Sequence, residues 1–173
     1  HLEYTLELDF DQAIEGYTAG INVNGEIIKV KIPAGVDNGS RVRVRQKGAV
    51  SPFGGPRGDL YIRVLVRPHP LFERKGKDLH VELPVTFPEA ALGATVEVPS
   101  LHDRTKIRIP PGTSSGKVFR ITGKGVRVSN GDGPGDLYVK IRIVVPKDLK
   151  GRAKELIEQL GREFPEDPRE KYW

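Results

Sequence analysis

Alternating apolar and polar residues predict β strands along most of the chain. In the opening stretch, 2–8, every second residue is apolar, which is the period-two pattern of a strand with one buried face. Two further runs, 17–23 and 26–32, flank Asn24-Gly25, the strongest short signal for a two-residue hairpin. A helical turn is predicted at 11–15, and further strands at 41–45, 59–66, 79–85, 94–99, 104–109, 117–122 and 136–145.

This strand pattern occurs twice. Residues 6–66 recur without a gap 77 positions later, and the two copies share 18 identical pairs. Many of these pairs are glycine or proline, so the copies share their turns as well as their strands. A period this long exceeds the roughly 20–50 residues of solenoid repeats and indicates two small domains in tandem. The matched turn residues include Gly16 with Gly93, Pro33 with Pro110, Gly35 with Gly112, Gly48 with Gly125, and Asp59 with Asp136.

The predicted fold class is mainly β, with two tandem homologous β-sandwich-like domains and a short C-terminal amphipathic helix. We place the first domain at 1–70, the second at 71–147, and the helix with its tail at 148–173. Residues 69–78 form a connector between the copies that is too short to be a domain of its own.

The C-terminal stretch has a different period. After Pro146 apolar residues recur every 3.6 positions, which predicts a helix over about 148–164. Asp148 suits the N-cap, and Pro165 lies just past the end. A helix of this length is marginal in water, so its apolar face needs a partner, either the second domain or another chain. That face carries Leu149, Ala153, Leu156, Ile157, Leu160 and Phe164.

Composition narrows the class of protein. The 173 residues include no cysteine, which excludes disulfides, thiolate metal sites and a cysteine nucleophile, and fits a reducing compartment. No apolar run approaches the roughly 18 residues of a membrane span, so we expect a cytoplasmic protein without membrane association. His1 begins abruptly beside a strand, which suggests that the chain continues upstream. The net charge of +5 permits nucleic-acid binding without requiring it.

Catalysis and cofactor binding find little support in the sequence. The four histidines are scattered and lack the spacing of a metal site. Ser100, His102 and Asp103 are the residue types of a hydrolytic triad, but one short loop cannot hold them on converging supports. The glycine-rich stretches 54–58 and 131–135 precede strands, whereas a phosphate loop opens a helix. We therefore predict no enzymatic activity, no metal site and no cofactor.

Basic residues alternate with apolar ones on several strands, so one sheet face of each copy is cationic. Such a face is usually a solvated surface that discourages edge-to-edge aggregation. It would also attract acidic peptides or nucleic acid, and a basic tandem β-domain nucleic-acid-binding protein is the alternative function. Few aromatic residues interleave with the cations, which argues against base stacking. The cations are Lys29, Lys31, Arg41, Arg43 and Arg45 in the first copy, and Lys106, Arg108, Arg120, Lys140 and Arg142 in the second.

Five strand residues of the first copy have two possible roles. Burial in the domain core is the simpler one. If the small domain leaves a groove beside an unpaired strand edge, the same residues would anchor an extended peptide that adds a strand to the sheet. These residues are Tyr4, Leu6, Ile21, Val23 and Ile62.

Three ordered motifs stand at consistent places in the two copies. They are Gly54-Gly-Pro-Arg-Gly-Asp-Leu-Tyr61 with its echo Gly133-Pro-Gly-Asp-Leu-Tyr138, then His69-Pro-Leu-Phe72 continuing to Leu79, and Leu83-Pro-Val with Ala90-Ala-Leu-Gly93. Together they resemble the C-terminal substrate-binding region of DnaJ-type (heat-shock 40-kDa) co-chaperones. The resemblance covers essentially the whole chain and implies two β-rich client-binding domains followed by a dimerisation helix.

The resemblance also implies a function. A protein of this kind binds non-native polypeptides, prevents their aggregation and passes them to the chaperone DnaK. The family's client groove falls on the five strand residues of the first copy, and the contact of a homodimer falls on the C-terminal helix. Two groove-bearing arms would raise the apparent affinity through effective concentration. The implied dimer residues are Leu149, Leu156, Ile157, Leu160 and Phe164.

The chain departs from the resemblance in several ways. No Cys-x-x-Cys zinc modules interrupt the first domain at the 23–27 hairpin, which indicates the zinc-finger-free kind. A J domain and its glycine-rich linker are not part of this sequence, so we expect no stimulation of the DnaK ATPase. Tyr4 is more polar than the aliphatic residue often found there. Its counterpart in the second copy is Val81, and that of Val23 is Ser100, so we expect the first copy to hold the client.

Overall fold

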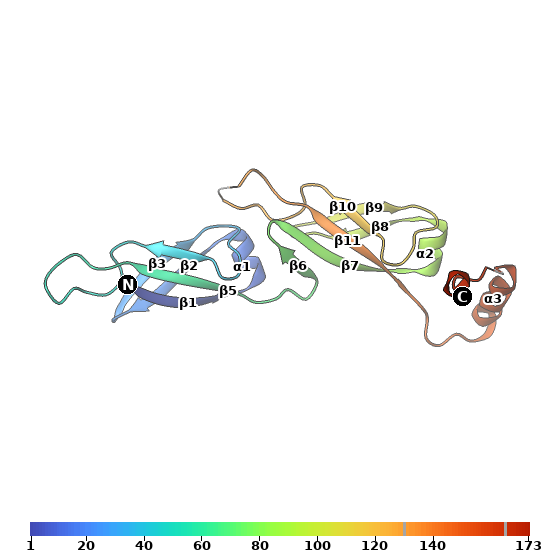
Figure 1. Ribbon diagram of the computed structural model, residues 1–173, viewed down its shortest axis with the longest axis horizontal. Helices are drawn as coiled ribbons and strands as arrows, with labels where there is room; N and C mark the ends of the chain where they lie inside the picture. The colour runs from blue at the N-terminus through green and yellow to red at the C-terminus, as the bar shows by residue number, and fades with distance from the viewer. Residues whose placement is uncertain (130, 165) are drawn as a thin grey trace. The chain divides into compact units, whose positions relative to one another are not determined.

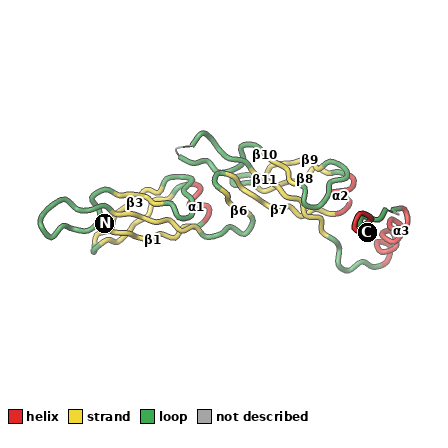
Figure 2. Tube along the Cα trace, viewed as in Figure 1, coloured by secondary structure: helices red, strands yellow, loops and turns green. Residues whose placement is uncertain are grey.

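The computed structural model describes residues 1–129, 131–164 and 166–173. The chain forms two compact units, His1–Ile143 and Val144–Trp173. Strands dominate the first unit, and a helix dominates the second (Figures 1 and 2). The mainly β fold class predicted from the sequence is confirmed.

The first copy is built from β1 (Leu2–Leu8), α1 (Phe10–Glu15), β2 (Tyr17–Val23), β3 (Glu26–Ile32), β4 (Arg41–Val44) and β5 (Leu60–Val66). Strands β1, β5 and β4 form one sheet in that order, and β2 and β3 form another. β1 runs parallel to β5, with Tyr4 beside Ile62 and Leu6 beside Val64. Helix α1 ends at Gly16, whose φ of +89° is a conformation that other residues rarely adopt.

The second copy is built from β6 (Phe72–Lys75), β7 (Asp78–Thr86), α2 (Phe87–Leu92), β8 (Ala94–Pro99), β9 (Arg104–Ile109), β10 (Val118–Ile121) and β11 (Leu137–Val144). Its larger sheet has the order β10-β11-β7-β6, and β8 pairs with β9. Strands β7, β11 and β10 correspond to β1, β5 and β4, whereas β6 is an addition. The connector at 69–78 was predicted without a strand, so β6 corrects that prediction. Phe72 is its one apolar residue, which left no alternation to detect.

The second unit contains helix α3 (Gly151–Glu163) and a single 3₁₀ turn at Glu170–Tyr172. The predicted helix is confirmed, but its predicted start at Asp148 is wrong. Lys150 keeps an extended backbone (φ −140°, ψ 158°) and occupies the N-cap instead. Pro165, predicted as the residue just past the helix, lies outside the described residues.

Each copy has a hydrophobic core, and the two cores use matching positions. Leu60 and Ile62 are buried in the first core, as are their counterparts Leu137 and Val139 in the second. The two cores agree with the duplication found in the sequence. The domain limits at residues 70 and 147 stay predictions.

The second core also takes side chains from the first copy. Phe10 and Ile14, on the outer face of α1, are 8% and 7% exposed and pack among residues of the second copy. The ring of His69 in the connector lies 5.1 Å from that of Phe10 and 5.0 Å from that of Phe72. Its Nδ1 accepts a hydrogen bond from the Leu71 N–H at 2.9 Å. Shared apolar contacts of this kind suit domains that are too small to bury much surface alone.

The repeated Gly-Asp-Leu-Tyr motif makes the same tether in both copies. Asp59 accepts hydrogen bonds from the Gln46 N–H at 3.1 Å and from Arg43 Nε at 2.7 Å. Asp136 accepts one from the Gly123 N–H at 2.9 Å. Gln46 and Gly123 have φ of 58° and 79°, so each carboxylate holds a left-handed turn residue in place.

Two matched glycines are required by close approach of the backbone. A Cβ on Gly48 would lie 2.2 Å from the carbonyl oxygen of Asp59, and one on Gly125 would lie 2.4 Å from that of Lys77. Neither glycine has a positive φ. Space, and not backbone conformation, explains why this glycine recurs in the duplicated sequence.

The tethers predict how stability responds to acid. The Gln46 N–H, then Arg43, lowers the pKa of Asp59, and the Gly123 N–H is the largest cause of the lowered pKa of Asp136. A folded pKa below the unfolded value of about 3.9 means that the ionised carboxylates stabilise the fold above about pH 4. This contribution disappears as the pH falls through the folded pKa.

We therefore expect Asp59→Asn with Asp136→Asn to lower the free energy of unfolding at neutral pH but not in acid. Urea titrations from about pH 7 down to about pH 3 would show the wild-type and variant curves converging as the carboxylates are protonated. Asp132→Asn, at an exposed site in the loop before β11, is the matched control and should follow the wild type. If the difference in free energy of unfolding between wild type and variant stayed constant over this pH range, the proposed role of the two carboxylates would be refuted.

Candidate functional site

β1 and β2 are two of the four strands of the first copy that have an unpaired edge within the described residues; β3 and β4 are the others. Within the described residues β1 borders only β5, and β2 pairs only with β3. Side chains of both sheets share the first core, so both edges lie at the rim of one small sandwich. In the second copy β6 covers the first half of β7, the counterpart of β1. Free backbone N–H and C=O groups on an edge are a template for pairing with another chain.

The β2–β3 hairpin determines which backbone groups of β2 face outward. Asn24 and Gly25 have φ of 53° and 84°, as in a type I′ turn, and Val23 pairs with Glu26. The closing pair of such a hairpin exchanges both hydrogen bonds, and the bonded positions then alternate along the strand. The groups that point away from β3 are therefore those of Thr18, Gly20 and Asn22.

Three of the five predicted groove residues are buried. Ile21, Val23 and Ile62 are 1%, 6% and 0% exposed and belong to the first core. Leu6 is half-buried against that core, and Tyr4 is 40% exposed. Tyr4 and Leu6 are thus the two that offer accessible surface, while the other three support the strands behind them. Their joint use as a client groove stays a prediction.

Sequence reasoning identified side chains and missed the free edge of β2. Alternation shows which residues share a face, but it does not show which strands become neighbours. The Asn24-Gly25 turn was the available signal, because it fixes the register of β2 on β3 and thereby the outward groups.

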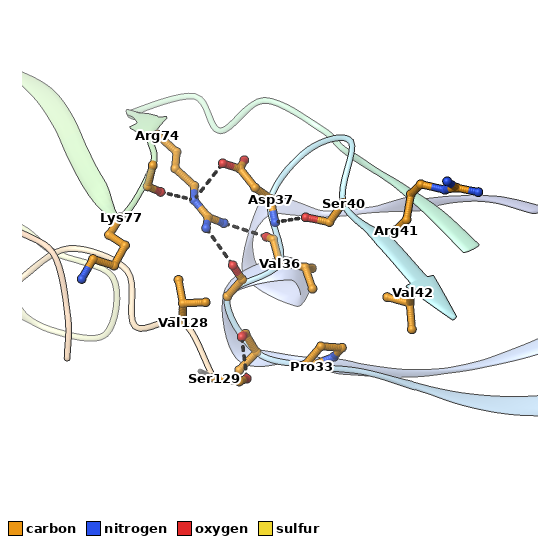
Figure 3. A pocket seen from close by; sticks show the side chains of 13 residues that line it. Pro33, Val36, Asp37, Ser40, Arg41, Val42, Arg74, Lys77, Val128 and Ser129 are labelled. Atoms are coloured by element: carbon orange, nitrogen blue, oxygen red, sulfur yellow. Dashed lines mark hydrogen bonds and ion pairs between the residues drawn. The ribbon is translucent and has the colours of Figure 1, made fainter. Parts of the chain in front are cut away.

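Arg74 fastens the connector to a turn of the first copy (Figure 3). Its guanidinium donates to the carbonyl oxygens of Val36 at 2.6 Å, Gly35 at 2.7 Å and Gly76 at 2.8 Å. It also lies 3.7 Å from the carboxylate of Asp37, and only 9% of the side chain is exposed. Burial lowers the pKa of Arg74 and Asp37 opposes this, but an arginine remains charged in proteins. One side chain therefore binds carbonyl oxygens of the connector and of the first copy. We call this contact between the two copies the joint.

The loop before β11 holds the same turn from another side. Ser129 donates to the Ala34 carbonyl through its N–H at 3.3 Å and its hydroxyl at 2.8 Å (Figure 3). A Cβ on Gly35 would lie 2.5 Å from the Arg127 carbonyl oxygen. The matching Gly112 has no neighbour within 4 Å in the described part of the chain. The close approach therefore belongs to the joint and not to the repeated turn.

An open hollow of about 430 Å³ lies beside Arg74 (Figure 3). Val36 and Val128 give it apolar walls, and Arg41 and Lys77 add cations. The donors of Arg74 are already bound to carbonyl oxygens, so the guanidinium holds the two copies together and does not act as a ligand-binding group of the hollow.

The triad-like residues of the β8–β9 loop form a closed turn. The Ser100 hydroxyl donates to the Asp103 carboxylate, and Lys124 lies 3.1 Å from the same carboxylate. His102 lies 3.6 Å from Glu15 instead. The hydroxyl is thus bound to an acid and not to an imidazole, so the pair needed for nucleophilic attack is not formed. Across the described residues, no group of three or more His, Cys, Asp or Glu side chains could hold a metal ion.

Helix α3 does not bury its apolar face within its own unit. Among the described residues of the helix, none is buried. Leu156 and Ile157 are each 47% exposed, and Phe164 is 61% exposed. Leu149 and Leu160 are half-buried. The role of these five residues in a dimer contact stays a prediction. No described helix is long and apolar enough to cross a membrane.

Residues 2–146 match the model of the DnaJ C terminal domain family. The chain belongs to this family. The match spans both copies, the edges of β1 and β2, and the Arg74 contacts, and it confirms the DnaJ-type resemblance stated from the three motifs.

Curated relatives of this DnaJ C-terminal domain carry the name Chaperone protein DnaJ. That of Bacillus cytotoxicus is 50% identical over 141 residues, which cover 81% of this chain and 38% of the relative. That of Acetivibrio thermocellus is 48% identical over 134 residues, covering 78% and 35%. Chaperone protein DnaJ 2 of Aquifex aeolicus is 48% identical over 159 residues, covering 87% and 42%. The chain thus spans about two fifths of the length of these relatives.

Removal of the Arg74 side chain is expected to weaken the joint. Arg74→Ala would leave the part-buried carbonyl oxygens of Gly35 and Val36 without their donor, and a buried unpaired polar group costs about 1–3 kcal/mol. We expect a loss of at least that size in the free energy of unfolding measured in urea. Arg104→Ala is the control, because that side chain is 80% exposed and makes a single surface ion pair. If Arg74→Ala and Arg104→Ala lost the same free energy of unfolding, the stabilising role of the Arg74 hydrogen bonds would be refuted.

Proposed function

We propose that this chain is the client-binding portion of a DnaJ-type co-chaperone. It binds non-native polypeptides in extended form on the first copy, keeps them from aggregating and delivers them to a DnaK-type chaperone. The proposal includes domains at 1–70 and 71–147, a dimerising segment at 148–173, and action in the cytoplasm without a catalytic step. The observation that carries it is the free edge of β2 in a copy that also exposes Tyr4 on the edge strand β1.

Strand addition explains how one site accepts many clients. Backbone hydrogen bonds from Thr18, Gly20 and Asn22 would read no side chains, so they suit unfolded chains of any sequence. Tyr4 and Leu6 add apolar anchors, each worth roughly 1.5–3 kcal/mol when fully covered. Ordering of the client opposes this gain, so binding is weak and reversible, as delivery to a second chaperone requires.

The difference between the copies supports the first as the client site. Tyr4 is 40% exposed, whereas its counterpart Val81 is 5% exposed and lies where β7 pairs with β6. The second copy has therefore closed the part of its sheet that the first leaves open.

The apparent affinity for a client rises when one assembly offers two such strand contacts instead of one. Two arms joined through α3 would hold one client at two places, and the second contact would then form at high effective concentration. The exposed face of α3, with Leu156 and Ile157, supports this assembly as a homodimer.

We expect Tyr4→Asp to reduce suppression of aggregation of a chemically unfolded protein, because a charge would replace an apolar anchor. Thr5→Asp is the matched control: it places the same charge on the opposite face of the same strand. Light scattering during dilution of the unfolded protein measures the effect. Ile62→Asp is not a suitable variant, since Ile62 is fully buried and its loss would unfold the domain. Equal suppression by the two folded variants would refute the groove.

The dimer contact is tested by Leu156→Asp with Ile157→Asp in the full chain. Both side chains are half exposed, so the substitutions should leave the protomer folded while charging its contact face. We expect sedimentation equilibrium to show at least a tenfold weaker dimer. Arg162→Asp, on the opposite side of α3, is the control and should dimerise as the wild type does. Dimerisation of the double variant at wild-type strength would place the contact elsewhere.

A further inference from the structure

The chain contains three Asn-Gly dipeptides, the sequence in which an asparagine loses its side-chain amide most readily. They are Asn24-Gly25, Asn38-Gly39 and Asn130-Gly131, and Asn130 lies outside the described residues. Glycine has no side chain to shield its nitrogen, so this nitrogen can reach the amide carbon of the asparagine before it. The two groups must first leave the hydrogen bonds that hold them. Local structure therefore decides which pair reacts.

Strand β5 holds both reacting groups of Asn38-Gly39. The Asn38 side chain accepts a hydrogen bond from the Val66 N–H at 2.9 Å, and the Gly39 N–H donates to the Val64 carbonyl oxygen at 2.7 Å. β5 is the central strand of its sheet, and Val64 is fully buried in the first core. Reaction at Asn38 would thus require this turn to detach from a strand at the centre of the domain.

The tip of the β2–β3 hairpin holds Asn24-Gly25 less firmly. Both residues are exposed, and the Gly25 N–H donates to the side-chain oxygen of Asn22 at 3.0 Å. Asn22 is itself exposed and lies outside the core. Opening of an exposed turn costs far less free energy than opening of a core strand. The second copy has Leu101-His102 at this position, so a hairpin tip with Asn-Gly belongs to the first copy alone.

We infer that Asn24 is a site of spontaneous deamidation, and that its isoaspartate product weakens client binding on β2. The Gly25 nitrogen bonds to Cγ of Asn24, the Cγ–Nδ2 bond breaks, and ammonia leaves with the proton of the Gly25 amide. Water then opens the succinimide ring that has formed. Opening at the Cγ carbonyl gives aspartate, and opening at the main-chain carbonyl, the usual major route, gives isoaspartate.

The two products affect the turn differently. Aspartate leaves the main chain intact and suits this position, since Asp-Gly also forms type I′ turns. In isoaspartate the main chain runs through Cβ and Cγ, which adds one atom to a two-residue loop. That loop determines the pairing of β2 with β3, which begins with Val23 opposite Glu26. Isoaspartate is therefore the product that disturbs the hairpin.

The disturbance falls first on the end of the proposed client edge. A slip of the whole hairpin by one residue would turn Ile21 and Val30 outward, although they are 1% and 4% exposed. The pairs next to the turn open instead, and Asn22 loses the position in which its backbone groups face a client. This step rests on the proposed function, because it assumes that clients pair with β2.

Ageing of the folded chain at mildly alkaline pH tests the site. Mass spectrometry of the peptides reports the change from amide to acid, and an isoaspartyl methyltransferase counts isoaspartate. We expect Asn24 to react at least tenfold faster than Asn38 in the folded chain, and at a similar rate in urea. Asn22→Ala removes the acceptor of the Gly25 N–H and should speed the reaction at Asn24 severalfold. Equal rates at Asn24 and Asn38 in the folded chain would overturn the site.

The effect on clients is tested by suppression of aggregation with aged protein. Asn24→Gly is the matched control, because it cannot deamidate at the tip, accepts the positive φ and ages equally elsewhere. We expect aged wild type to suppress aggregation at least threefold less than aged Asn24→Gly. Fresh Asn24→Asp, which has the charge without the extra main-chain atom, should match fresh wild type.

The outcomes separate this inference from the proposed function. If fresh Asn24→Asp lost as much suppression as aged wild type, the altered main chain would be refuted as the cause. If aged wild type with isoaspartate at Asn24 kept full suppression while Tyr4→Asp lost it, the effect of deamidation would be refuted and the client site would stand. If Tyr4→Asp also kept full suppression, both would be refuted.

Discussion

Insertion of Phe10 and Ile14 into the core of the neighbouring copy is the contact on which the rest of the first unit depends. Each copy is near the size at which a single core becomes marginal, so the shared cluster joins two weak cores into a stronger one. Arg74 and Ser129 then fix the adjoining turn by satisfying its carbonyl oxygens. Because this joint uses the outer face of α1, it leaves the edges of β1 and β2 free for other use.

A free strand edge is useful for capturing extended chains, but it is also a risk for self-association. The first copy limits that risk with charges such as Glu3 and Glu7 on the exposed face of β1. The second copy limits it differently, by pairing β6 to the start of β7. The copies therefore differ at β1 and β7, whereas β8, the counterpart of β2, pairs only with β9 within the described residues.

The sequence was sufficient for the parts of the fold that local chemistry decides. Strand alternation, the Asn24-Gly25 turn and the repeated glycines are all local, and the hairpin and every described strand except β6 were predicted from them. Burial was not predictable in the same way. Alternation puts Ile21 and Ile62 on an apolar face but cannot say whether a client or the domain itself covers that face. Phe10 and Phe87 show the limit most clearly, because the same residue in the same repeat is buried once and exposed once.

Copies joined head to tail always leave one joint unfilled. The face of α1 is covered by the segment after the first copy, and the face of α2 would need an equivalent cover after the second. A third copy would only move the open face along the chain. The open face is therefore a consequence of the duplication itself and would remain at any number of copies.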